Sequence, residues 1–326
     1  MGRLPPMRGL ALVAVMAGAC AAVAADTPAH TFGWAFPHPP PGTPGTAEPP
    51  PRRDLGVPGS TRRYDAARLG DLFRAVDWFP NSHPTPPRPI LTGRKPNAMA
   101  CGYCHLPDGQ GRPENAALAG LPAAYIVEQV RDMRSGARSG AAPDWGPTHY
   151  MRQVAKGADA GEVAEAARYF AGLEYKKAFR LVEASDIPAV APMFGLYGRK
   201  PGGGRERLGQ RIVEVPNDIH RFELRDNRPG YTIYVPEGAI TRGRALAENG
   251  SGGRFPPCVA CHGQGMKGGL GPPLAGRYPA YLFRQLVGFS VGGRTGPAAA
   301  AMAPVARRLR PEEMIDLAAY AASLEP

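Results

Sequence analysis

Two copies of one pentapeptide decide the organisation of this chain: Cys101-Gly102-Tyr103-Cys104-His105 and Cys258-Val259-Ala260-Cys261-His262. The spacing C-x-x-C-H is typical of covalent c-type haem attachment. Two thiols one helical turn apart can each form a thioether with one vinyl group of the same haem, and the next residue can bind the iron as its proximal His ligand. Two copies therefore predict two covalently bound haem c groups.

The one cysteine outside these motifs, Cys20, lies in a segment with the pattern of an export signal, residues 1–25. Arg3 and Arg8 supply a basic start, an apolar run too short to span a bilayer follows, and Ala22-Val23-Ala24 supplies the cleavage pattern of small residues. We expect a signal peptide and a periplasmic protein. The alternative that the sequence leaves open is a lipid anchor at Cys20.

The formal net charge of the chain is +11, which narrows the class of partner. A basic surface can indicate nucleic acid, but export argues against it. Electrostatic steering toward acidic redox proteins is the better interpretation, and simple solubility is the alternative. Because no later apolar stretch reaches 18 residues, we expect no membrane span in the mature chain, although a membrane-bound oxidase or dehydrogenase remains a candidate partner.

The motifs lie within an internal repeat. Leu118-Ala119-Gly120 recurs as Leu274-Ala275-Gly276, and Arg138-Ser139-Gly140 resembles Arg294-Thr295-Gly296. Further pairs continue the match: Tyr125 with Tyr281, Gln129 with Gln285, Met151 with Met302, Tyr169 with Tyr320, and Leu173 with Leu324. Such a run of matches predicts two copies of one unit.

Helical patterns dominate both copies. The second predicts helices over 238–248 and 281–289 and a last helix opened by Pro311, while Asp159 and Glu162 form a candidate capping box in the first. The chain then divides into five predicted parts: a signal peptide (1–25), a Pro-rich arm (26–89), a first haem domain (90–173), a linker (174–237) and a second haem domain (238–326).

The arm and the linker have patterns of their own. Ten prolines between residues 26 and 60 predict an extended or disordered segment, in which Trp34 and Phe36 either fasten the arm to a haem domain or are stray aromatics. In the linker, 210–215 and 231–235 favour short strands.

The identity of the sixth iron ligand distinguishes electron carriers from haem enzymes. Met302, forty residues after His262, is the candidate in the second unit. Met151 aligns with it in the first unit, where His149 is the competitor and Met133 aligns with a packing position. A thioether ligand favours reduced iron, and two six-coordinate sites would be closed and suited to outer-sphere electron transfer.

Neighbouring groups suggest a difference between the two sites. The Pro272 carbonyl can accept a hydrogen bond from His262, whereas the first unit has Ala116 at this position, which puts the geometry in doubt and favours unequal potentials. Arg138 and Arg294 are candidates for haem propionate contacts, with solvated surface arginines as the alternative.

At this point the chain resembles the class I cytochrome c domain: C-x-x-C-H, then Gly271 to Gly276 in the pattern G-P-x-L-x-G, then Met302, then a helix ending Ala319 to Leu324. The first unit matches apart from the position of Pro272. Two such domains in one exported chain resemble the dihaem cytochromes of the c4 type. That resemblance implies an all-α fold with two domains in tandem and electron transfer toward terminal oxidases. The long arm and linker resemble c-type cytochromes associated with periplasmic dehydrogenases.

Two functions remain open at this stage. The leading hypothesis is a dihaem electron carrier, or the electron-transfer subunit of a dehydrogenase. The alternative is an enzyme: a dihaem peroxidase or thiosulfate-oxidising protein with one open or unusually ligated haem. A shared zinc site is excluded because the two cysteine pairs lie too far apart, and a thioredoxin-like dithiol because no βαβ pattern surrounds either motif.

Overall fold

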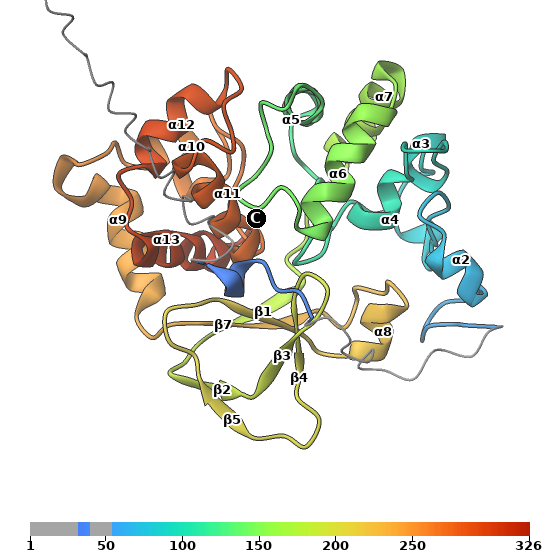
Figure 1. Cartoon of the computed structure of the whole chain (residues 1–326), viewed down its shortest axis with the longest axis horizontal. Coiled ribbons are helices and arrows are strands. Elements are labelled where there is room, and N and C mark those ends of the chain that lie inside the picture. Colours follow the sequence, from blue (N-terminus) through green and yellow to red (C-terminus); the bar gives the residue numbers. More distant parts are fainter. Residues whose placement is uncertain (1–31, 40–53) are drawn as a thin grey trace, which may run out of the picture.

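The computed structural model describes residues 32–39 and 54–326. The predicted signal peptide and Cys20 lie outside these residues. Two helical units stand side by side above a β-rich linker (Figure 1). We call residues 90–173 the first unit and 238–326 the second unit; the five-part division itself stays a prediction. None of the helices in the described parts of the chain is long and apolar enough to cross a membrane.

The second unit contains every helix that its sequence predicts. Its elements are α9 (Ala239–Gly253), α10 (Val259–His262), η3 (Gln264–Met266), α11 (Pro279–Ser290), α12 (Ala299–Ala306) and α13 (Pro311–Ser323). Pro311 is the first residue of α13, where its missing N–H leaves no hydrogen bond unmade. The buried helix α13 packs against α9 and α11, and its apolar face joins the largest hydrophobic core of the molecule.

The first unit repeats this plan with a shorter start. Its elements are α3 (Arg88–Leu91), α4 (Cys101–His105), α5 (Ala123–Ser135), α6 (Gly146–Gly157) and α7 (Ala160–Ala171). The predicted capping box is present: Asp159 caps α7, and its backbone N–H donates to Glu162. Prolines leave only four residues for α3, where the second unit has the fifteen-residue α9. The all-α character predicted for both units is confirmed.

The linker forms three small sheets. Its elements are β1 (Phe179–Glu183), β2 (Asp186–Pro188), β3 (Val190–Pro192), β4 (Tyr197–Arg199), β5 (Arg205–Arg207), β6 (Val213–Pro216), α8 (Ile219–Glu223) and β7 (Tyr231–Val235). In the largest sheet β7 is central, parallel to β1 and antiparallel to β6. The two strands expected from the sequence are β6 and β7. Every residue of β7 is buried, and its side chains contribute to two of the hydrophobic cores.

The N-terminal arm is more ordered than its prolines predict. The described elements are η1 (Gly33–Ala35), α2 (Ala66–Gly70) and η2 (Pro80–Ser82), and a separate small core forms around Leu55, Val57 and Trp78. For residues 54–60 the disordered alternative is wrong, because Leu55 and Val57 are buried in that core, whereas the extended alternative agrees with the antiparallel bridge between Leu55 and Tyr64. Trp34 packs on Phe283 with ring centroids 4.6 Å apart, so the arm is fastened to the second unit.

Glu214 on β6 ties the linker to α11. The residue is 3% exposed, and its carboxylate accepts a hydrogen bond of 3.1 Å from the Ala280 N–H in the first turn of α11. Burial raises the pKa of this carboxyl to about 7, and the Arg284 guanidinium only partly opposes that shift.

This carboxyl should make stability depend on pH. The folded chain holds the Glu214 proton more tightly than the unfolded chain, whose ordinary pKa is 4.5. Its contribution to the free energy of unfolding is therefore complete below pH 4.5 and lost as the pH rises to about 7, by up to about 3 kcal/mol. We expect Glu214→Gln to reduce the pH dependence of the free energy of unfolding, measured by urea denaturation between pH 4.5 and about 7. Parallel pH profiles for variant and parent would contradict the assignment.

Candidate haem sites

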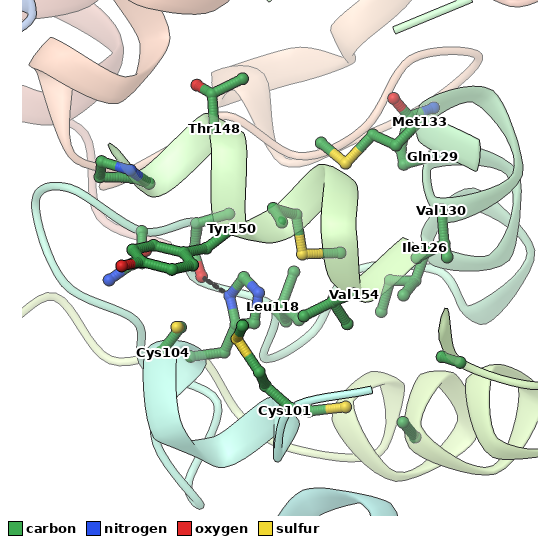
Figure 2. Close-up of a pocket in the computed structure, with 18 of the residues that line it drawn as sticks. Cys101, Cys104, Leu118, Ile126, Gln129, Val130, Met133, Thr148, Tyr150 and Val154 are labelled. Carbon is green, nitrogen blue, oxygen red and sulfur yellow. Dashed lines mark hydrogen bonds between the residues drawn. The ribbon is translucent and has the colours of Figure 1, made fainter. Parts of the chain in front are cut away.

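The first motif forms the five-residue helix α4, which places both thiols on one turn. Figure 2 shows Cys101 and Cys104 facing a space that Leu118, Ile126 and Val154 also line. The space is a cavity of about 180 Å³ with mostly apolar walls. Polar residues of both units line it, among them Glu114, Gln129, Arg138 and Glu162 from the first and Tyr281, Arg284 and Gln285 from the second.

His105 is held in a metal-binding orientation. Its ring is 9% exposed, and its Nδ1 lies 2.8 Å from the Ala116 carbonyl oxygen, which leaves Nε2 free for a metal. Burial lowers the pKa of His105 and so favours the neutral imidazole that binds metals. A backbone acceptor on the second ring nitrogen is the usual partner of a metal-bound His.

The candidates for the sixth ligand of this site differ in position. Met151 on α6 lines the cavity. His149 is exposed, hydrogen-bonds Gln153 at 2.8 Å and is not part of the lining. Met133 on α5 also lines the cavity, beside Gln129 and away from Cys104 (Figure 2). The geometry therefore favours a thioether over His149.

The second motif forms α10, with Cys258 as the preceding residue. The His262 Nδ1 lies 2.9 Å from the Pro272 carbonyl oxygen, and burial lowers the pKa of this ring as well. Met302 is partly buried on α12. Unlike the cysteines of the first motif, Cys261 is exposed.

The sequence suggested that the hydrogen bond to the proximal His differs between the two sites, and the structure shows no such difference. The Ala116 and Pro272 carbonyls meet their histidines at 2.8 and 2.9 Å. A backbone carbonyl can be presented by any residue, so the loop does not require a proline. This contact therefore gives no reason to expect unequal potentials.

Cys101 and Cys258 are not activated thiols. Burial raises the pKa of Cys101 to about 12 and that of Cys258 to about 11. Redox dithiols have lowered thiol pKa values. The pattern therefore favours neutral thiols positioned for thioether formation.

Arg138 and Arg294 are buried where the two units meet, so the alternative of solvated surface arginines is wrong. Each guanidinium donates to both repeat-related glutamines: Arg138 to Gln129 at 2.9 Å and Gln285 at 2.8 Å, and Arg294 to Gln129 at 2.6 Å and Gln285 at 3.3 Å. Within the described residues neither arginine forms an ion pair with a carboxylate. Of the two, Arg138 lines the cavity.

These observations test whether the residues fit a haem. Buried cations without a counter-ion are costly, so Arg138 and Arg294 fit an anionic group such as a propionate. The apolar cavity, the paired thiols and an imidazole with a free Nε2 fit the rest of the molecule. The second site fits a haem by the types of its residues alone, which are two cysteines, His262 and Met302.

Sequence reasoning missed several contacts to the first site. Near Cys104, Arg225 of the linker meets Arg112 of the first unit, and the second unit's Arg277 donates to the Ala117 and Ala119 carbonyls, both at 2.9 Å. These pairs are more than 100 residues apart, and no local pattern announces them.

The family model of cytochrome c matches residues 240–325, which is the second unit. Over 236 residues the chain is 30% identical to the thiosulfate dehydrogenase electron acceptor of Stutzerimonas stutzeri, an alignment that covers 71% of this chain and 82% of the relative. It is 27% identical over 202 residues to cytochrome c4 of Azotobacter vinelandii, covering 61% and 71%. Among solved structures, the thiosulfate dehydrogenase TsdBA of Marichromatium purpuratum is 30% identical with a TM-score of 0.45, covering 69% of this chain and 36% of that one.

Proposed function

This chain is a c-type cytochrome of the family that contains cytochrome c4 and the thiosulfate dehydrogenase electron acceptors, and we propose that it binds two haems and carries electrons between redox proteins. The observation that carries the proposal is the repeated site. Each C-x-x-C-H turn presents a His whose Nδ1 meets a backbone carbonyl, with a Met in the same unit.

The residues of the first site would divide the work of holding the haem. Cys101 and Cys104 would form the thioethers, and His105 would bind through Nε2. Met151 would supply the other iron ligand and favour the reduced form. When bound, haem supplies a one-electron iron couple. Arg138 would meet a propionate, and the apolar walls would exclude water.

The second site repeats these roles with Cys258, Cys261, His262 and Met302. The Pro272 carbonyl would fix the orientation of His262. Arg294 lies on the shared boundary between the units and would balance propionate charge there. If His and Met hold each iron in this way, the chain would act by outer-sphere electron exchange.

The name of one relative suggests which redox proteins exchange electrons with this chain. Because one relative is named an electron acceptor of thiosulfate dehydrogenase, we propose a dehydrogenase of this kind as the donor and a terminal oxidase as an acceptor. The pattern of residues 1–25 supports export to the periplasm as the meeting place. The net positive charge of the chain supports acidic proteins as its partners.

Spectroelectrochemical titration of the purified holoprotein tests the function. We expect reversible uptake of two electrons, low-spin spectra in both oxidation states, and a long-wavelength Met–iron charge-transfer band that accounts for two haems. A high-spin component in the oxidised protein, together with turnover of peroxide or thiosulfate, would instead support the dihaem enzyme.

A further inference from the structure

The outer face of the first motif is covered by another part of the chain. The Arg225 guanidinium lies 3.5 Å from the ring centroid of Tyr103, the third residue of the motif. Its Nη1 also donates to the Tyr103 carbonyl at 2.8 Å. Stacking and hydrogen bonding together hold this arginine against the α4 turn.

Arg225 belongs to a segment that we call the α8 cover, residues 219–228. The cover is anchored on both sides. Trp78 of the arm donates to the Leu224 carbonyl at 2.7 Å, and Arg112 of the first unit lies over the Phe222 ring at 3.7 Å from its centroid. In Figure 1 α8 lies directly below α4, with α2 of the arm beside it. The cover thus occupies the approach to the first motif.

The second motif has no such cover among the described residues. Ala260, at the position of Tyr103, and the neighbouring Cys261 are both exposed. The loop that follows is tied to this turn, because the Gly271 N–H donates to the Cys261 carbonyl at 2.8 Å. Leu270 in this loop is 93% exposed, the most exposed of the large apolar side chains described.

The second motif also lies in a stretch of sequence with an excess of positive charge. Residues 249–311, which include the second motif and Met302, contain eight Lys and Arg and no Asp or Glu. Five of the eight are exposed: Arg254, Lys267, Arg307, Arg308 and Arg310. Arg254 and Arg310 pair with Glu313, while Lys267 forms no ion pair with a side chain among the described residues and donates a hydrogen bond of 3.0 Å to the Pro326 oxygen. Exposed positive charge beside an exposed apolar side chain is complementary to the surface of an acidic protein.

We propose that electrons enter and leave this chain through the second unit alone, which docks an acidic redox protein on the face formed by Ala260, Cys261, Lys267 and Leu270. This inference rests on the proposed function. The α8 cover closes the matching face of the first unit. The first haem therefore exchanges electrons with the second across the contact between the units, not with partners directly.

Reduced flavodoxin, an acidic one-electron donor, serves as the probe. Each productive encounter oxidises the flavodoxin by one electron and reduces one haem iron. Lys267→Glu should lower the second-order rate constant about tenfold at low ionic strength, and the difference should vanish at high salt. Lys95→Glu is the matched control, since it makes the same charge change at an exposed lysine six residues before the first motif in the sequence, and should slow the reaction less than about twofold. Equal slowing, or greater slowing by Lys95→Glu, would overturn the proposal.

Two further measurements keep the test independent of one variant. Leu270→Ser should weaken flavodoxin binding about tenfold at any salt concentration, because it removes an apolar anchor. Carbodiimide cross-linking of the unaltered holoprotein should join Lys267 to the flavodoxin; links at Lys95 in place of Lys267 would contradict the docking face. Haem content is counted first: fewer than two haems would overturn the proposed function and this inference with it, whereas two haems with equal slowing would overturn the inference alone.

Discussion

Replacing Met151 with Ala should open the first haem site while the second stays closed. The Met–iron charge-transfer band should fall by about half, and a high-spin component should appear in the oxidised spectrum. Because a thioether ligand favours reduced iron, one of the two potentials should fall by on the order of 0.1 V, within the ~0.8 V that axial ligands span. Optical redox titration measures both effects together.

Two control variants decide whether Met151 is the ligand. His149 is exposed and outside the cavity lining, so His149→Ala should leave the spectrum unchanged. Met133 lines the cavity beside Gln129, so Met133→Ala should weaken packing and leave the band intact. Loss of the band in Met133→Ala, with no loss in Met151→Ala, would assign the iron to Met133.

Gly243→Ala should destabilise the second unit by several kcal/mol. Gly243 lies where α9 crosses α13, and a Cβ there would overlap the Asp316 carbonyl oxygen and lie 2.8 Å from the Tyr320 Cβ. Both partners are held on a buried helix and cannot move aside cheaply. We expect a large fall in the urea midpoint of the holoprotein, with its m-value retained.

The matched control is Gly161→Ala. This glycine lies in the first turn of α7, and a Cβ there would meet nothing within 4 Å. Alanine is the better helix former by up to about 1 kcal/mol, so stability should be unchanged or slightly raised. Similar losses from both substitutions would show that α9 and α13 are not in close contact.

The sequence predicted those features that depend on interactions between residues close together in the chain. The C-x-x-C-H spacing, the capping box at Asp159 and Pro311 at the start of α13 each depend on neighbours within one helical turn. The repeat extended that reach, because it paired Met151 with Met302 without any knowledge of the fold. Strands β6 and β7 were predictable because β-branched residues fill them.

Contacts between distant segments were not predictable. The α8 cover depends on Arg225 meeting Tyr103 across 122 positions, and the shared arginine network depends on how the units face each other. The burial of Leu55 and Val57 shows the same limit, since prolines report local backbone preference and say nothing of a partner surface. The short strands β2 to β5, three residues each, are too brief for a periodic pattern.

Intact mass measured on the purified, exported protein under denaturing conditions tests the central claim most directly. Denaturation releases any haem that is held by ligands alone and retains haem that is joined through thioethers. The account predicts one species whose mass equals that of the polypeptide plus two haems. A mass corresponding to the polypeptide alone, or to a single haem, would contradict it.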